Sequence, residues 1–311
     1  MRENAYVIPP VVLEQLSAAG IKVHASAPTQ TRGLKSDTFL ITHDGGSAIL
    51  KIYNSRGGTP VAKCTREWLA LGSLESIPHI PHRLCHEPDS WLLMECLPGN
   101  TLRSQWDGLD QHGRRRICVE LGAAYGQIAS APQEPRVHDL VRQSRPGTWV
   151  DSLPEAIANI DRLLQSEPRV AGSTFTSTAH RVRTLLESPS APQLLVKADC
   201  NSDNTLADHG TLTGIIDWEQ ACIGDRWIHF GIVLDHTHFL DWTAVRAGIE
   251  DVVGPWSRED EELVLAAGYL CVWRKIIEFD ARSAWFSDPS RQVNRMRAMT
   301  AAMGPSHAQP D

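Results

Sequence analysis

Short apolar runs separated by turn residues dominate the first hundred positions of the chain. Asp44-Gly45 lies between two such runs, and Asp-Gly in that setting is a strong signal for a hairpin. A second pair of runs flanks a turn that contains Pro88. We therefore predict two β-hairpins, built from the runs 37–42 with 47–53 and 83–86 with 91–97.

Two helices accompany these strands, and helical periodicity dominates the rest of the chain. Pro10 and Gly20 bracket one apolar stretch, as prolines and glycines bracket helices, and Pro60 opens a second that runs to about Leu74. Beyond Pro98-Gly99 the predicted helices are residues 111–130, 154–166, 173–187, 226–253 and 257–282. One β-rich island interrupts them, with a strand at 193–199 and a hairpin formed by 205–207 and 212–217.

This order of elements predicts an α+β protein with two lobes. The first, residues 1–98, is small and β-rich, and the second, residues 99–311, is larger and mostly helical. Pro98-Gly99 is the expected hinge between them.

Composition narrows the functional classes. Of the 311 residues, 42% are apolar and 22% are charged, which excludes a wholly disordered chain. A net charge of −7 argues against nucleic acid and anionic membranes as partners. The seven cysteines form no CxxC pair, so neither a zinc cluster nor a disulfide framework is indicated. With no apolar run typical of a signal peptide or membrane span, we expect a cytoplasmic protein.

The segment 194–225 carries the chemistry. Asp199 and Asn204 follow an apolar strand, and Asp217 ends a second apolar run after an intervening hairpin. That hairpin can bring the three side chains to one end of a small sheet. Carboxylate and amide oxygens suit Mg²⁺ beside phosphate groups, and another carboxylate can orient an attacking hydroxyl. The set is what phosphoryl transfer requires, although each residue is also common in ordinary turns.

The run KADCNSDN…GIIDWEQACIGD resembles the catalytic region of the aminoglycoside phosphotransferase and choline kinase family, whose pattern is H-x-D-x-x-x-x-N, then I-D-[WF]-E and G-I-G-D. The resemblance implies a protein-kinase-like fold and a phosphotransferase that uses Mg²⁺ and ATP, with GTP as the alternative donor. It implies Asp199 as the catalytic base and Asn204 with Asp217 as metal ligands. The glycine-rich loop and Ala-Pro-Glu segment of protein kinases are missing.

The same resemblance assigns residues of the first lobe to the nucleotide. Lys51, inside the apolar strand AILKIY, becomes the lysine that pairs with phosphate, and Glu67 on the next helix its partner. Glu95 and Leu97 would offer backbone groups to the base. The segment 31–37, which includes Ser36, would cover the phosphates, although it reads equally well as a plain turn.

Two positions depart from the family pattern. Lys197 stands where the family has histidine, and His229 stands where it has an aspartate that supports the catalytic loop. Support of the loop or contact with the acceptor are the roles left open for Lys197, Trp218 and Glu219. The departures leave a non-catalytic, nucleotide-binding pseudokinase as an alternative function.

The acceptor is the least determined part of the prediction. The window 217–262 holds eleven acidic residues and three arginines, which favours a cationic acceptor such as an aminoglycoside, although acids in a first helical turn also serve the helix. By eye the catalytic region is most similar to hygromycin-modifying members. A metabolic kinase of an amino-alcohol or sugar is the alternative. His236 and His238 are not spaced as a helical metal pair and are predicted to be non-ligands.

Overall fold

The computed structural model describes residues 7–29, 36–54, 60–88, 90–132, 178, 180–182, 184–185, 194–237, 240–280 and 289–303. They form two compact units. The first holds the described residues of Met1–Gly108 together with Asp203–Ala221. The second holds those of Leu109–Ala131, Arg145–Ser202 and Cys222–Asp311. The segment 99–108 and the hairpin 203–221 thus group with the N-terminal sheet, while the lobe boundary at residues 98 and 99 stays a prediction.

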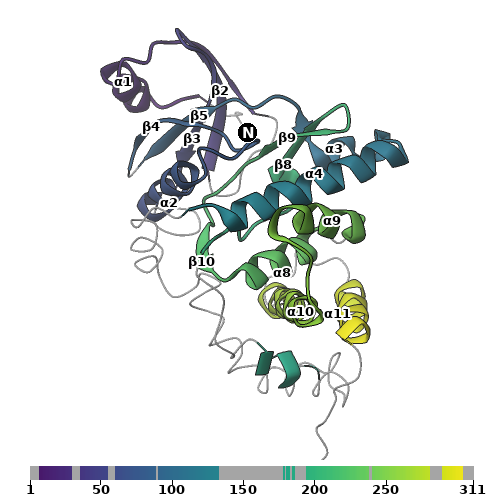
Figure 1. The fold of residues 1–311 in the computed structure, drawn as a ribbon. Coiled ribbons are helices and arrows are strands. Elements are labelled where there is room, and N and C mark those ends of the chain that lie inside the picture. The colour runs from purple at the N-terminus through teal and green to yellow at the C-terminus, as the bar shows by residue number, and fades with distance from the viewer. Residues whose placement is uncertain are drawn as a thin grey trace, which may run out of the picture. The chain divides into compact units, whose positions relative to one another are not determined.

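A five-stranded antiparallel sheet is the frame of the first unit (Figure 1). Both predicted hairpins are confirmed, and His43 pairs with Gly46 across the two-residue turn Asp44-Gly45. In spatial order the strands are β1 (Val23–Pro28), β2 (Ser36–His43), β3 (Gly46–Tyr53), β5 (Trp91–Glu95) and β4 (Arg83–Glu87). The sequence analysis missed β1, because its exposed polar and small residues give no apolar alternation.

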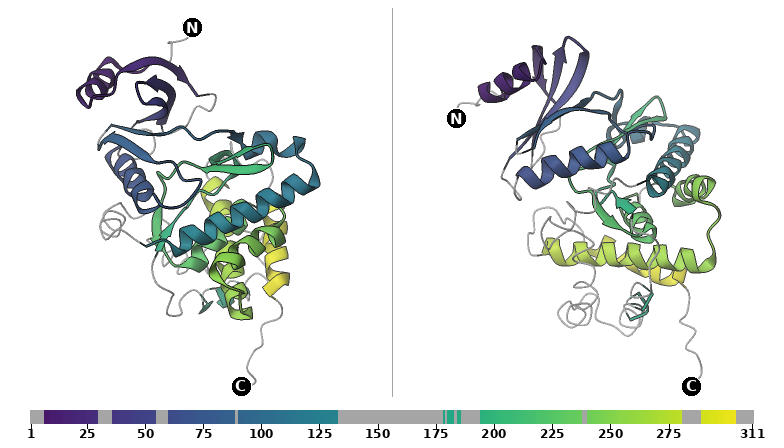
Figure 2. Two further views of the ribbon diagram at one scale, coloured as in Figure 1. Left: turned by 45° about the horizontal axis from the view of Figure 1, so that its top comes forward. Right: turned by 60° about the vertical axis from the view of Figure 1, so that its left-hand side comes forward.

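Two helices pack beside this sheet (Figure 2). Helix α1 (Pro10–Ala18) buries Val12 and Leu16 with sheet residues that include Leu50, and each fully buried side chain of this kind contributes roughly 1.5–3 kcal/mol. Helix α2 (Pro60–Ser73) carries Glu67, which is completely buried. A buried glutamate requires partners, because an isolated charge in the interior is too costly.

A small three-stranded sheet completes the first unit: β6 (Asn100–Thr101), β8 (Thr205–Asp208) and β9 (Thr211–Ile215). The predicted hairpin is confirmed, and its turn residues His209 and Gly210 both have positive φ, as a tight hairpin turn requires. Gly99 has a φ of 97°, and a Cβ there would lie 2.4 Å from the Ala207 carbonyl oxygen, so the close approach of β6 to β8 requires glycine.

The second unit is mostly helical. Helix α4 (Gln111–Ser130) packs on α9 (Trp242–Val253) so closely that a Cβ on Gly122 would meet the Val245 carbonyl oxygen at 1.9 Å. Strand β7 (Leu194–Val196) pairs with β10 (Cys222–Gly224), which leads into α8 (Arg226–His236). Helix α10 (Arg258–Asp280) packs on α8 and on α11 (Pro289–Met303).

Helix predictions were right for 111–130 and nearly right for 257–282. The single helix predicted over 226–253 was wrong: α8 ends at His236, and Asp241 starts α9 by accepting a hydrogen bond from the Ala244 amide. Helix α11 was missed. The predicted helix 154–166 lies outside the described residues, and of 173–187 only 178, 180–182 and 184–185 are described, all helical. None of the helices in these described ranges is long and apolar enough to cross a membrane.

Candidate active site

Lys51 is the centre of a buried charge cluster in the first unit. Its Nζ donates to Glu67 Oε2 at 2.7 Å and to Asp217 Oδ1 at 2.6 Å, and it lies 3.1 Å from Glu219 Oε2. Burial alone would lower the pKa of Lys51, but the negative charges of Asp217, Glu67 and Glu219 outweigh it and raise that pKa well above its ordinary value. Lys51 is therefore a fixed cation. The structure places it beside Glu67, the partner that the family resemblance implied, and also beside Asp217.

Glu67 uses both carboxylate oxygens within the cluster. Besides Lys51, its Oε2 accepts from the Tyr53 hydroxyl at 2.5 Å, and its Oε1 accepts from the Trp218 amide at 2.9 Å. Burial raises the pKa of Tyr53, and Glu67 raises it further, so the phenol stays a donor. Sequence reasoning missed Tyr53, although a residue two positions after Lys51 on one strand shares its face of the sheet.

The segment after β9 supplies the other two carboxylates. Asp217 has a φ of 63°, in the left-handed region that few residues other than glycine adopt and that is often found at functional sites. Trp218 is fully buried and donates from Nε1 to the Ile215 carbonyl, so it supports the turn. Arg66 donates a hydrogen bond to the backbone carbonyl of Glu219, and this bond holds the backbone of Glu219 in place. Burial raises the pKa of Glu219, Lys51 opposes the shift, and Asp217 and Glu67 add to it.

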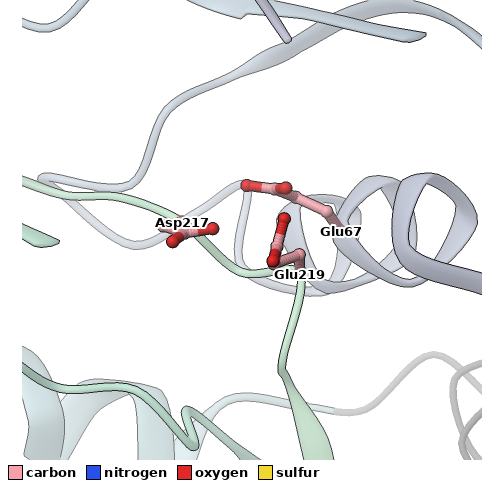
Figure 3. A group of neighbouring side chains, drawn as sticks. All are labelled: Glu67, Asp217 and Glu219. Carbon is pink, nitrogen blue, oxygen red and sulfur yellow. The ribbon is translucent and has the colours of Figure 1, made fainter. Parts of the chain in front are cut away.

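These carboxylates can hold a cation. One oxygen each from Glu67, Asp217 and Glu219 lies within 4.8 Å of the others, and Figure 3 shows the three groups turned toward one another. Both carboxylate oxygens of Glu67 accept hydrogen bonds, whereas the Asp217 side chain is 32% exposed and the described contact of Glu219 Oε2 is Lys51 Nζ at 3.1 Å. Asp217, the most exposed of the three, and Glu219 offer carboxylate oxygens of the kind that Mg²⁺ prefers.

Asn204 lies at the same end of the hairpin as Asp217. The Ile216 amide donates to the Asn204 carbonyl at 2.9 Å, which continues the β8–β9 pairing to the residue before Asp217. Asn204 is buried at the end of a short 3₁₀ turn. This pairing supports the prediction that Asn204 and Asp217 act together.

The other predicted nucleotide residues also belong to the first unit. Ser36 is buried at the start of β2, and the segment 31–35 lies outside the described residues. Glu95 ends β5 and is tied to His82, whose carbonyl accepts from the Glu95 amide at 2.8 Å. Leu97 follows, with its Cδ1 packed over Gly214 of β9. The structure thus brings Leu97 to the hairpin that ends at Asp217.

Asp199 lies in the second unit, three residues after β7. Its Oδ1 accepts a hydrogen bond from Asn201 Nδ2 at 2.7 Å and lies 3.8 Å from Nε2 of His236, the last residue of α8. The Asp199 side chain is 22% exposed, so it is open to a reactant. Sequence reasoning missed His236 because no local pattern links position 199 to position 236.

Lys197 and His229, the two residues that depart from the family pattern, are linked by a hydrogen bond. The Lys197 amide donates to Nδ1 of His229 at 3.4 Å, and both side chains are buried. Burial and the nearby charge of Lys197 together lower the pKa of His229 to about 3, against an opposing effect of the Tyr125 backbone, so the ring is neutral and can accept. A neutral histidine thereby holds the segment before Asp199 by a backbone hydrogen bond.

Comparison with known proteins identifies the family. The family model described as "Phosphotransferase enzyme family" matches residues 30–263, which is most of the chain. The chain belongs to the phosphotransferase enzyme family. A search of curated protein sequences finds no match. The predicted aminoglycoside phosphotransferase family, and with it a small-molecule kinase, is confirmed.

Solved structures confirm the predicted kinase-like fold of this phosphotransferase. The GDP complex of aminoglycoside 2'-phosphotransferase-IIIa is 14% identical with a TM-score of 0.63, covering 94% of this chain and 97% of its own. A thermostable mutant of APH(4)-Ia with ADP and hygromycin B is 14% identical with a TM-score of 0.59, covering 95% and 98%. Macrolide 2'-phosphotransferase MphH from Brachybacterium faecium is 13% identical with a TM-score of 0.60, covering 97% and 98%.

Nine of the eleven acidic residues in the window 217–262 of the phosphotransferase make a described contact within the fold. Asp225 and Asp241 cap helices, and Asp217 and Glu219 contact Lys51. Five more contact arginines: Asp235 with Arg295, Glu250 and Glu261 with Arg246, Asp260 with Arg226, and Glu262 with Arg181 and Arg258. Counting acids therefore overestimated the negative surface available to a cationic acceptor.

His229 makes the stability of the phosphotransferase depend on pH. Its folded-state pKa of about 3 lies below the ordinary 6.5, so the unfolded chain binds the extra proton and stability is lost as pH falls from about 6.5 toward 3. Between pH 7.5 and 5 the expected loss from this group is about 2 kcal/mol of unfolding free energy. Urea unfolding at both pH values measures it. In His229→Gln the acid-induced loss should shrink by that amount, and an equal loss in both proteins would contradict the assignment.

Proposed function

We propose that the protein is an ATP-dependent kinase that transfers the γ-phosphoryl group to a hydroxyl of a small molecule, with an aminoglycoside-type antibiotic as the first candidate acceptor. The observation that carries the proposal is the Lys51 cluster, in which one buried ammonium contacts Glu67, Asp217 and Glu219. A purely structural ion pair would need one carboxylate. The surplus of negative charge suits a site that is completed by a metal ion and a triphosphate.

In this proposal the first unit binds the nucleotide. Lys51, held in place by Glu67, neutralises the phosphates, and Glu95 and Leu97 offer backbone groups to the base. Ser36 belongs to the segment that covers the phosphates. Both ADP and GDP occur in the complexes of structural neighbours, so ATP and GTP are the donors to compare.

Asn204 and Asp217 are the proposed magnesium ligands, and Glu219 offers a further buried oxygen beside them. When bound, the ion neutralises charge on the β- and γ-phosphates. Asp199 orients the acceptor hydroxyl and takes its proton as transfer proceeds. Trp218, buried under the turn, and Lys197, buried before Asp199, serve as supports.

Acceptor identity rests on the neighbours and on chemistry. Gentamicin, streptomycin and hygromycin B are bound in similar structures, and one neighbour is a macrolide phosphotransferase. Because arginines hold many of the acids, strong positive charge on the acceptor is not required, and a macrolide belongs in the test panel. A cytoplasmic location stays a prediction.

The test is a mass-shift screen with Mg-ATP and Mg-GTP against gentamicin, streptomycin, hygromycin B, a macrolide, choline and simple sugars. We expect a gain of one phosphate on an antibiotic, abolished by EDTA and restored by Mg²⁺. Asp217→Asn should raise the Mg²⁺ concentration for half-maximal rate by roughly tenfold, since a carboxylate ligand is replaced by a weaker one. Nucleotide binding without product across the panel would favour the pseudokinase alternative. Phosphorylation confined to choline or sugar would favour a metabolic kinase.

A further inference from the structure

The strongest unassigned feature of the second unit is the ring of His236 beside Asp199. Nε2 of His236 lies 3.8 Å from Asp199 Oδ1, and the two side chains are 15% and 22% exposed. They come from different elements, because His236 ends α8 and Asp199 follows β7. The contact therefore depends on tertiary packing, and both groups can exchange protons with water.

The hydrogen bond on the other side of the ring determines its tautomer. Nδ1 of His236 lies 3.0 Å from the carbonyl oxygen of Ile232, which can only accept. Nδ1 must therefore carry a proton, and in the neutral ring Nε2, which lies 3.8 Å from Asp199 Oδ1, carries a lone pair. A carboxylate this close to a neutral imidazole favours the protonated form of the ring.

The charged groups described around His236 have ion-pair partners of their own. Asp235, on α8 itself, lies 3.9 Å from Nδ1 and is buried, and Arg295 of α11 holds it in an ion pair at 2.5 Å. Helix α10 also packs on α8. Its acidic residues with described ion pairs contact arginines instead: Asp260 with Arg226, Glu261 with Arg246, and Glu262 with Arg181 and Arg258.

We propose that His236 is a positioning residue that accepts from Asp199 the proton released by the acceptor hydroxyl. This inference rests on the proposed function of Asp199 as the base. As the new P–O bond forms and the bond from phosphorus to the nucleotide breaks, the acceptor O–H bond breaks and the proton passes to Asp199. The carboxyl then gives it to Nε2, either directly as the 3.8 Å contact tightens or through one water, and the imidazolium releases it to solvent.

The test compares wild type with His236→Gln in single-turnover phosphate transfer from Mg-ATP to hygromycin B, and in phosphate release from Mg-ATP with water as the acceptor. At about pH 8 we expect the variant to transfer phosphate to hygromycin B about tenfold more slowly than wild type. The KM for hygromycin B should stay within twofold of the wild-type value. Wild type should slow steeply between about pH 8 and 5 as the ring takes up a proton, and the variant should not. Added imidazole should restore much of the rate of His236→Ala.

His112→Gln is the matched control, because His112 is exposed at the start of α4 and should behave as wild type. A uniform loss in His236→Gln with an unchanged pH profile and no imidazole rescue would overturn the relay. The same follows from a wild-type rate and profile in that variant while Asp199→Asn is inactive, and in that case the proposed function stands. Full activity of Asp199→Asn would instead show that Asp199 is not the base, and the proposed relay would then be wrong as well.

Discussion

Asp199→Asn is expected to reduce phosphate transfer by a factor of roughly 10² to 10⁴, the range that a positioned general base contributes. The amide keeps the size of the side chain and can still meet Asn201, but it cannot take the proton of the acceptor hydroxyl. Nucleotide affinity should change little, because Asp199 is not part of the Lys51 cluster. Product formed in single-turnover mass spectrometry measures the first effect, and calorimetric titration with Mg-ADP measures the second.

Asp203→Asn is the matched control for this substitution. Asp203 is near Asp199 in the sequence, but its side chain is 44% exposed and contacts Arg103 in an exposed pair worth about 1 kcal/mol or less. It should retain most of the transfer rate. If the two variants were equally active, Asp199 would have no role in proton transfer.

Lys51→Met is expected to have the largest effect on stability. It leaves Glu67 and Glu219 buried and Asp217 partly buried, with no cation among them. Removing one partner of a buried ion pair costs about 3–5 kcal/mol, because the remaining charge is uncompensated. The loss should grow as pH rises, since burial raises the pKa of Glu219, and this carboxylate takes up a proton at low pH and relieves the repulsion. Urea unfolding at pH 5 and 8 measures both effects.

The same substitution should weaken Mg-ADP binding and slow transfer by roughly 10²-fold or more if Lys51 neutralises the phosphates. Lys22→Met, at an exposed lysine, is the control and should do neither. Adding Glu67→Gln to Lys51→Met should recover part of the lost stability, because one unpaired charge is removed, but none of the lost affinity. Unchanged stability and affinity in Lys51→Met would show that the cluster contributes neither to folding nor to nucleotide binding.

Local chemistry explains what could be predicted from the sequence. Asp44-Gly45 and His209-Gly210 specify tight turns, Pro10 begins α1, and the hairpins and α4 follow from alternation and periodicity. Candidate residues such as Lys51, Glu67 and Asp217 came from the family resemblance together with their positions on a strand, a helix and a strand end. The structure brings those three into contact because the elements that carry them fold together.

Where prediction failed, the deciding forces were not local. Residues 226–253 have continuous helical periodicity, yet the chain ends α8 at His236 and starts α9 with the Asp241 cap. Acidic residues in the same region looked like a cation-binding wall, but arginines distant in sequence, such as Arg181 and Arg295, pair with them. The number of acidic residues in a segment does not show which of them pair with basic residues elsewhere in the chain.

The amino-acid sequence by itself determined the family, the three hairpins and helices such as α4, because turns, caps and periodicity depend on neighbouring residues. It also singled out Lys51, Glu67 and Asp217 as candidate site residues through the family resemblance. Only the tertiary structure decided that Tyr53 and Trp218 hold Glu67, that three carboxylates share Lys51, and that His236 faces Asp199. Contacts between residues far apart in sequence are set by how elements pack, and packing is a property of the whole folded unit.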